Sequence, residues 1–403
     1  MLSSPSPSRP PMWLLVLITI SGTMAMHMFV PALPVMAQEF GATPGEAQLT
    51  ISAYILGLAA GQLFYGPLSD SFGRRPLLMV GLALYSASGV LAALAPNVHL
   101  LVLARLLQAL GGCAGLALGR AMVRDSSASH ETLRKLATLN LMIMVGPGLA
   151  PMAGSMLAHG FGWRSVFWVL AAVGTTTLFL AAHRLPETAA AKGAFTTRTF
   201  LTDYRKLLTS RPFVCYALGG GCATTAVYAF IATAPFLFHN ELNRPLGEVG
   251  LYLGMIVFGL SLGNLMAGRL STRLTADQLL RVGSALGLLG SLIFLGLNLT
   301  ASLSVGWIIA SMLVFTCGAG LSSPVALARA VSVEPALTGS AAGLYGFTQM
   351  LIGAVCTSLV TIGSNPALSA ACVMVAAVLL AAGGFAYARS RRTASAPEGG
   401  SGA

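Results

Sequence analysis

Charge is what this sequence has least of. Of its 403 residues, only 9% are Asp, Glu, Lys or Arg, whereas 55% are hydrophobic. A soluble domain carries about 25% charged residues, so this chain cannot cover a water-facing surface, and lipid must surround most of it. Its apolar runs are long enough to cross a bilayer as helices, which takes roughly 20 residues. They lack the alternating pattern of barrel strands, so we expect an all-α membrane protein.

Several chemical signatures are also missing. The six cysteines all fall in apolar runs without metal-ligand or disulfide spacing, which is typical of packing residues. The sequence contains no Gly-x-x-x-x-Gly-Lys loop, so we do not expect ATP to drive it directly. The formal net charge is +11, but no basic run is interleaved with aromatic residues, and nucleic acid is not an expected partner. We therefore expect no enzyme activity, no cofactor and no bound metal.

Twelve apolar segments are predicted to span the membrane. The first could be mistaken for a signal peptide. It is longer than the 7–15-residue core of one, and it contains Pro31 and Pro34. The predicted spans are 12–36, 47–66, 77–95, 99–121, 136–158, 163–182, 213–238, 247–268, 279–299, 302–326, 339–362 and 367–388.

Basic residues gather in the connectors on one side of these spans. By the positive-inside rule that side is cytoplasmic, which places both termini and the long central loop in the cytoplasm and requires an even number of spans. A shift of about 202 residues superposes Gly66-Pro67-Leu68-Ser69 on Gly268-Arg269-Leu270-Ser271. Two related halves with a site at the midplane are typical of a transporter.

The chain is predicted to be a monomer in the inner (cytoplasmic) membrane of a bacterium. Its five predicted parts are a cytoplasmic N-terminal segment (1–11), a six-helix bundle (12–182), a cytoplasmic central loop (183–212), a second six-helix bundle (213–388) and a cytoplasmic tail without regular structure (389–403).

Three short motifs carry a family resemblance. Residues 66–76, Gly-Pro-Leu-Ser-Asp-Ser-Phe-Gly-Arg-Arg-Pro, form a charged connector between the second and third spans. The others are Arg105-Leu-Leu-Gln-Ala-Leu-Gly111 and Gly146-Pro-Gly-Leu-Ala-Pro-Met-Ala-Gly154. Together they resemble the major facilitator superfamily, and within it the twelve-span bicyclomycin/chloramphenicol-resistance type of drug:proton antiporter. The resemblance covers nearly the whole chain and implies two pseudo-symmetric six-helix bundles that exchange drugs for protons by alternating access.

The first motif is the candidate conformational gate. Arg74 can pair with Asp125 at the end of the fourth helix, while the resemblance implies that Asp70 lies against the eleventh helix, which begins near Ala336. Such contacts would lock the halves together in an outward-facing state. The alternative is a solvated turn. The gate residues are Gly66, Asp70, Gly73, Arg74, Arg75 and Asp125.

The third motif is the candidate hinge. Proline bends a membrane helix, and glycine lets a neighbouring helix approach closely. These residues could instead serve packing alone. They are Gly146, Pro147, Pro151 and Gly154.

Proton coupling is the point at which the sequence departs from the family. The first helix typically carries an aspartate four residues before the first proline of the stretch Pro31-Ala-Leu-Pro34, but here that residue is His27. By our count no acid lies within a membrane core. Imidazole exchanges a proton near neutral pH, so His27 could carry or sense the proton, line the cavity as a neutral group, or be structural. Arg105 lies inside the fourth span and should face a partner or a wet cavity, unless it snorkels to the outer surface.

A drug site should be mostly apolar with a few polar groups. Without an acid in the membrane, neutral or weakly polar amphiphiles such as phenicols are favoured over cations. For any single lining candidate, lipid exposure or packing remains an alternative.

Alternative functions are export of a natural metabolite (a dipeptide, nucleoside or metallophore) and a non-transporting membrane sensor. The expected partners are the small amphiphile, protons and the lipid bilayer. The candidate cavity residues are Met24, His27, Tyr54, Asn140, Met144, Tyr228, Phe230, Phe236, Asn264, Tyr345 and Gln349.

Overall fold

The computed structural model describes residues 10–126, 135, 139, 148–188, 197–363 and 365–394, and these residues are almost entirely helical. Among them, eleven helical segments are long and apolar enough to cross a membrane. Residues 148–161 are also helical and fall in the predicted fifth span (136–158), most of whose other residues lie outside the described ranges. The prediction of an all-α membrane protein is confirmed.

In the first half, the first segment is divided into α1 (Met12–Met28), η1 (Val30–Ala32) and α2 (Leu33–Phe40). The remaining helices are α3 (Pro44–Phe72), α4 (Arg74–Ala93), α5 (Val98–Ser126) and α7 (Arg164–Arg184).

In the second half, the first segment is divided into α9 (Arg211–Thr225), α10 (Val227–Phe236) and the π-helical turn η2 (Leu237–Glu241). The remaining helices are α11 (Leu246–Leu270), α12 (Ala276–Leu299), α13 (Val305–Val331), η3 (Pro335–Leu337), α14 (Thr338–Leu359), η4 (Val360–Ile362) and α15 (Pro366–Ala394).

The two halves repeat the same packing. In the first half α5 packs against α1, α3 and α4, and α4 packs against α7; in the second half α13 packs against α9, α11 and α12, and α12 packs against α15. Glycines separated by about 202 residues make these contacts: Gly57 and Gly61 of α3 lie against α5, whereas Gly259 and Gly263 of α11 lie against α13. A side chain at these positions would overlap the facing helix, so the repeat reflects close helix packing.

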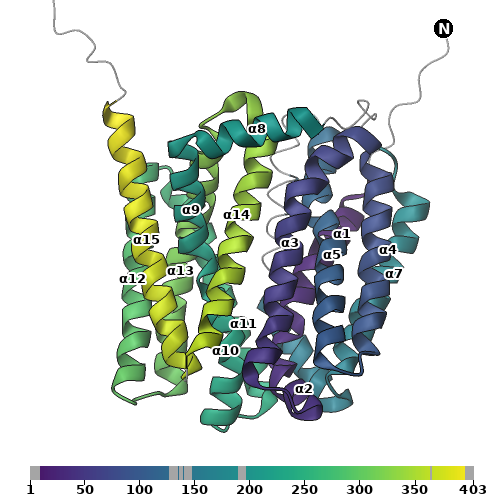
Figure 1. Ribbon diagram of the computed structural model, residues 1–403, viewed down its shortest axis with the longest axis vertical. Coiled ribbons are helices and arrows are strands. Elements are labelled where there is room, and N and C mark those ends of the chain that lie inside the picture. The colour runs from purple at the N-terminus through teal and green to yellow at the C-terminus, as the bar shows by residue number, and fades with distance from the viewer. Residues whose placement is uncertain are drawn as a thin grey trace, which may run out of the picture.

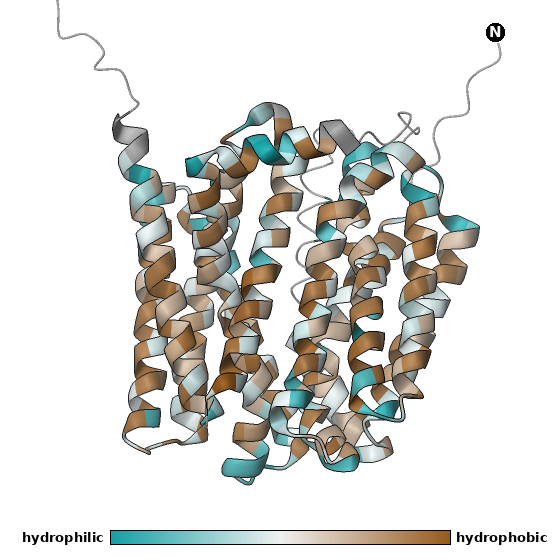
Figure 2. Ribbon diagram, viewed as in Figure 1, coloured by the Kyte–Doolittle hydropathy of each residue, from teal (hydrophilic) through white to brown (hydrophobic). Residues whose placement is uncertain are grey.

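Polar capping boxes begin two of the helices. A capping box between Thr43 and Glu46 begins α3, and one between Thr275 and Gln278 begins α12. In each box the threonine hydroxyl accepts a backbone N–H that has no partner inside the helix. Such partners are needed because a helix leaves its first N–H groups unpaired. Figure 2 shows the resulting distribution, with hydrophobic residues through the middle of the molecule and hydrophilic ones at both ends.

The structure corrects three predicted boundaries. First, α3 continues to Phe72, so Gly66 and Asp70 lie within a helix and the connector shrinks to a break at Gly73. Second, the central segment, which the sequence predicts to be a loop, contains the helix α8 (Thr197–Thr209). Third, α15 extends to Ala394, beyond the start of the predicted unstructured tail at residue 389. In each case a helix extends into polar sequence, where an apolar run no longer marks it.

Both ends of the helical array lie on one side. α1 begins and α15 ends at the end of the molecule covered by α8, while α2 lies at the opposite end (Figure 1). We call these the α8 end and the α2 end.

The two halves meet where glycines let the backbones of facing helices approach closely. Near the α2 end, Ser155 donates a hydrogen bond to the carbonyl oxygen of Leu246 in α11. A side-chain carbon at Gly250 would lie 2.6 Å from the carbonyl oxygen of Pro151, and one at Gly254 would lie 2.6 Å from that of Gly148. On the other side of the molecule α3 packs against α14.

Candidate functional site

A cluster of charges at the α8 end surrounds the break between α3 and α4. Gly73 has φ 93° and ψ 154°, a conformation that side chains disfavour. The Glu187 carboxylate follows α7 and accepts the backbone N–H groups of Arg74 and Arg75, each at 3.0 Å. In return Arg75 Nη2 donates to the carbonyl oxygen of Ala182 in the last turn of α7, at 2.7 Å. The negative Glu187 side chain thus caps the start of α4, and the positive Arg75 side chain caps the end of α7. Each charge is the one that the helix dipole favours at that end.

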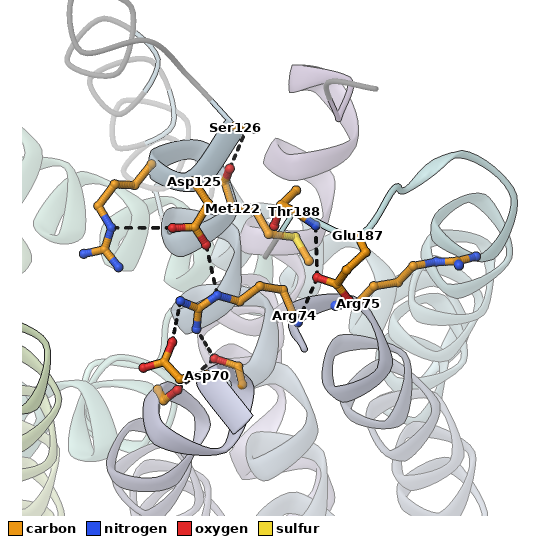
Figure 3. Close-up of polar contacts among 11 residues, drawn as sticks. Asp70, Arg74, Arg75, Met122, Asp125, Ser126, Glu187 and Thr188 are labelled. Carbon is orange, nitrogen blue, oxygen red and sulfur yellow. Dashed lines mark hydrogen bonds and ion pairs between the residues drawn. The ribbon is translucent and has the colours of Figure 1, made fainter. Parts of the chain in front are cut away.

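Arg74 is the centre of this cluster, and Figure 3 shows it between Asp70 and Asp125. Its Nε lies 3.0 Å from Asp125 Oδ2 and its Nη2 lies 2.6 Å from Asp70 Oδ1; Nη1 also donates to the Ser69 hydroxyl. The Arg74 side chain is only 7% exposed, whereas Asp70 is 52% exposed. One guanidinium thus joins the end of α3 to the end of α5, which excludes a solvated turn.

In the described part of the chain, no hydrogen bond or ion pair joins Asp70 to α14, the eleventh helix of the prediction. Among the described residues, the ion pair that Asp70 forms is with Arg74 in its own half of the molecule, and none joins it to α14. The resemblance implied a link between the halves, but this geometry gives a link within the first half.

At this end α8 adds a contact between the halves to the direct packing of α3 on α14. Pro67 lies inside α3 and has no N–H, so the carbonyl oxygen of Leu63, four residues earlier, has no partner in its own helix. The Tyr204 hydroxyl of α8 donates to that oxygen at 3.0 Å. The same hydroxyl lies 3.5 Å from the position of a side-chain carbon at Gly343 in α14.

Further contacts extend this three-helix junction. The Phe200 ring of α8 stacks on Phe64 of α3, with ring centroids 6.0 Å apart. Lys206 Nζ lies 2.8 Å from Glu334 Oε2, in the segment that leads to α14. The Gln62 side chain lies directly against Gly346 of α14. α8 therefore connects α3 to α14, one helix from each half.

Arg105 is fully buried, which rules out snorkelling to the outer surface. Its Nη1 donates to the carbonyl oxygen of Ala25 at 3.0 Å and to Gln108 Oε1 at 2.8 Å. The guanidinium carbon lies 4.0 Å from the centre of the Tyr54 ring, with Phe29 and Phe167 at 5.5 and 5.6 Å. Aromatic faces and a carbonyl dipole thus surround the cation, and no described carboxylate pairs with it.

His27 is also buried, in the last turn of α1. Its Nδ1 lies 3.0 Å from the carbonyl oxygen of Thr23. A carbonyl can only accept, so Nδ1 carries a proton in this contact and Nε2 is the nitrogen that can take up another.

Two of the four candidate hinge residues are described. Pro151 faces α11 through its carbonyl oxygen, and Gly154 lies against the carbonyl of Met28, directly after His27. The helix 148–161 therefore lies between the first segment of one half and α11 of the other. Gly146 and Pro147 lie outside the described residues.

The described candidate cavity residues are distributed over helices of both halves and differ in burial. Tyr54 is fully buried, donating to the Gly22 carbonyl oxygen at 2.7 Å beneath Arg105. Phe230 packs edge-on against Phe294 in the second half, and Tyr345 is buried against Gly220. The half-buried candidates are Met24, Tyr228, Asn264 and Gln349, whereas Phe236 is 8% exposed, and Asn140 and Met144 lie outside the described residues.

Gln349 is the best-connected polar candidate. Its Nε2 donates to the Thr224 hydroxyl at 2.6 Å, and its carbonyl oxygen accepts from Thr225 at 3.0 Å. These contacts bind α14 to the end of α9, beside Tyr228, whose ring lies against Gly353.

Sequence reasoning missed two residues of this region. The sequence places both Glu187 and Tyr204 in the predicted central loop (183–212) and gives neither a structural role. The spacing of Phe200, Tyr204 and Leu207 places one apolar face on a helix, so the pattern for α8 was present. Nothing local marks Glu187 as the cap of a helix 113 residues earlier in the chain.

Comparisons with known proteins define the class. The fold is that of a polytopic membrane transporter: a solved structure of a bacterial homolog of the human lysosomal transporter Spinster matches with a TM-score of 0.72 at 17% identity, over 95% of this chain and 96% of that one. The family model of the Major Facilitator Superfamily matches residues 15–357. The chain belongs to this superfamily.

Three curated proteins are similar to this chain over most of its length. An uncharacterized MFS-type transporter, YdgK of Bacillus subtilis, is 28% identical over 94% of this chain and 95% of the relative. The multidrug transporter MdfA of Yersinia pestis is 27% identical over 84% and 83%. A bicyclomycin resistance protein homolog of Haemophilus influenzae is 25% identical over 83% and 84%. The resemblance drawn from the motifs is confirmed.

We predict that Arg74→Gln destabilises the protein far more than Arg124→Gln does. Both arginines face Asp125, but Arg124 lies 3.9 Å away and is 60% exposed. Removing Arg74 should cost roughly 1–3 kcal/mol, less than for a fully buried pair because Asp70 is half-exposed. Removing Arg124 should change stability by about 0.5 kcal/mol or less. Thermal unfolding of the purified protein in detergent measures both, and equal shifts would contradict the central position of Arg74.

A second prediction concerns the proline-freed carbonyl of Leu63. Tyr204→Phe should cost about 1 kcal/mol in the native chain, because it leaves a part-buried acceptor unpaired. In a Pro67→Ala background residue 67 regains its N–H, so the Leu63 carbonyl oxygen can pair within α3 and Tyr204→Phe should then cost much less. The four proteins form a double-mutant cycle read out by thermal unfolding. Additive effects would show that Tyr204 does not depend on the proline.

Proposed function

We propose that this protein exports amphiphilic drugs across a bacterial inner membrane in exchange for protons. The observation that carries the proposal is its match, over more than four-fifths of each chain, to a multidrug transporter and a bicyclomycin resistance protein homolog. The gate and hinge motifs of the chain, which resemble those of the drug:proton antiporters, support it.

The substrates we favour are neutral or weakly polar. The described acids stand near helix ends or outside the spans: Glu39, Glu46, Asp70, Asp125, Glu187, Asp203, Glu241, Glu248, Asp277 and Glu334. The buried ionisable groups near the first segment are the cation Arg105 and the imidazole of His27. A cationic drug would lose its hydration without gaining a fixed negative partner, so phenicol-like amphiphiles fit better.

His27 is our candidate for the proton-exchanging group. It replaces the expected aspartate at the end of α1, and its Nε2 is the ring nitrogen available for a second proton. It precedes Met28, whose carbonyl lies against Gly154 of the hinge helix. Protonation there is therefore next to the contact between the first segment and the helix that packs on the opposite half.

Alternating access would use contacts at both ends of the molecule. At the α2 end, helix 148–161 meets α11 through Ser155 and two glycines. At the α8 end, α8 joins α3 to α14, and Arg74 fixes the end of α3 to α5. We infer that the α8 end faces the cytoplasm, since Arg74, Arg75, Arg124, Lys206, Arg281, Arg329 and Arg389 gather there.

Efflux of a neutral phenicol should depend on the proton gradient. In an efflux-deficient host, expression should lower accumulation of the phenicol more than that of a cationic dye or a dipeptide, and a protonophore should abolish the difference. Uptake of labelled compounds measures this. Selective export of cationic dyes would overturn the substrate class, export of dipeptides alone would favour a metabolite exporter, and export that survives the protonophore would overturn antiport.

His27→Gln should abolish drug-dependent proton flux in proteoliposomes while the protein remains folded. Glutamine keeps a polar side chain but cannot titrate. The matched control is His183→Gln: His183 Nδ1 lies 2.9 Å from the Phe179 carbonyl oxygen, the same contact four residues back, but on the exposed face. Internal pH dyes report the flux. Unchanged flux in His27→Gln would remove this residue from coupling.

A further inference from the structure

A groove runs between α12 and α15 on the periphery of the second half, away from the contacts between the halves. Its volume is ≈ 260 Å³, below the 300–1,000 Å³ of ordinary small-molecule sites. The lining residues are Asp277, Leu280, Arg281, Ser284, Ala285 and Leu288 of α12, with Val378, Ala382, Phe385, Ala386 and Arg389 of α15.

The groove has a polar end and an apolar end. Arg281 and Arg389 line it near the α8 end, at the start of α12 and toward the end of α15. Leu288 and Val378 line it deeper in the span. Its floor lies where the helices meet, since a side-chain carbon at Gly287 would be 3.5 Å from Val378. Each helix contributes residues over twelve positions, which are eleven steps of 1.5 Å or about 17 Å. That length is about half of a hydrocarbon core of roughly 30 Å, which is one leaflet.

The polar end is electropositive. Asp277 is the single acid in the sequences of α12, α13 and α15, and it is already paired with Arg329 Nη2 at 3.3 Å. The charged residues that line the groove are thus two arginines, Arg281 and Arg389, and one carboxylate that Arg329 already balances. Arg281 Nε donates to the backbone carbonyl oxygen of Asp277 at 3.3 Å, which draws the side chain toward the start of α12.

A buried polar group beside the arginines lacks a partner. The Ser284 side chain is 8% exposed, lines the groove one turn below Arg281, and its hydroxyl has no hydrogen-bond partner in the described part of the chain. A buried hydroxyl without a partner is unfavourable, so a ligand that supplies an acceptor would complete the site.

The surface around the groove faces lipid. Val282 and Leu289 of α12 and Leu379 and Leu380 of α15 are 42–69% exposed, and such apolar residues on a spanning helix contact acyl chains. The occupant must therefore combine an anionic, oxygen-rich head at one end with a hydrocarbon chain that occupies one leaflet.

We propose that this groove binds an anionic phospholipid of the cytoplasmic leaflet. The phosphate lies between Arg281 and Arg389, an oxygen of the glycerol or ester region accepts from the Ser284 hydroxyl, and one acyl chain follows the groove past Ala382 to Leu288 and Val378. Basic groups between spanning helices on the cytoplasmic side are suited to such head groups. The site is independent of the transported substrate.

The test is a binding titration of the full-length protein, delipidated in neutral detergent and followed by native mass spectrometry. The probes are dioleoyl-phosphatidylglycerol, dioleoyl-phosphatidylcholine and inorganic phosphate. Wild type should bind phosphatidylglycerol at least about fivefold more tightly than phosphatidylcholine, and phosphate alone should not compete. Arg281→Gln and Arg389→Gln should each weaken phosphatidylglycerol binding about fivefold, as expected for one basic group near a charged head.

Controls separate charge from folding. Arg273→Gln removes an exposed arginine of the same side that does not line the groove, and it should leave binding unchanged. The double variant Arg281→Lys with Arg389→Lys keeps the charge and should retain the preference for phosphatidylglycerol. Ala382→Trp fills the apolar part and should weaken binding of both lipids.

Three results would overturn the proposal. They are equal binding of both lipids by wild type, unchanged phosphatidylglycerol binding in both Arg281→Gln and Arg389→Gln, and full competition by inorganic phosphate, which would indicate an anion site without a lipid chain.

Discussion

The fold depends on one constraint: a polar group inside the bilayer must find its partner within the protein. Pro67 illustrates it, since removal of one N–H from α3 leaves the Leu63 carbonyl oxygen to be paired by Tyr204 of α8. Arg105 illustrates it again, because a backbone carbonyl, an amide and aromatic faces surround its charge. At both sites a polar group that its own helix cannot satisfy is paired by a neighbouring helix, so these sites join separate helices.

Close packing follows from the same constraint. Between lipid-exposed helices there is little hydrophobic driving force, so association relies on van der Waals contact and short approach. The glycines of α3 and α11 meet this need at equivalent places, and they give the two halves the same arrangement of helices. At the α2 end the halves meet where helix 148–161 packs against α11. At the α8 end they meet directly, where Gln62 of α3 lies against Gly343 and Gly346 of α14, and also through α8. Two separate interfaces at opposite ends are what alternating access requires.

The sequence predicted the spans well because each is a long apolar run, and it predicted the Arg74–Asp125 pair because a motif marks it. It failed where structure depends on distant residues. Glu187 caps α4 from 113 positions away, and Tyr204 reaches Leu63 across 141. Helix ends were also placed too early, since α3 and α15 continue into polar sequence. For the candidate cavity, the sequence identified polar residues on the spans but not the direction in which their side chains point. Tyr54 and Tyr345 are therefore found packed inside the halves.

The charge balance of the interior bears on how the proposed exchange would be driven. With a neutral drug leaving and one proton entering, each cycle moves one net positive charge inward. Such transport draws on the membrane potential, which contributes about 2.3 kcal/mol per charge per 100 mV, as well as on the pH difference. A monovalent cation exchanged for one proton would move no net charge and could use the pH difference alone. An interior with a buried cation at Arg105, and with the described carboxylates near helix ends or outside the spans, disfavours a cationic drug. Under the proposed exchange, the feature that would favour a neutral substrate would therefore also make its export electrogenic.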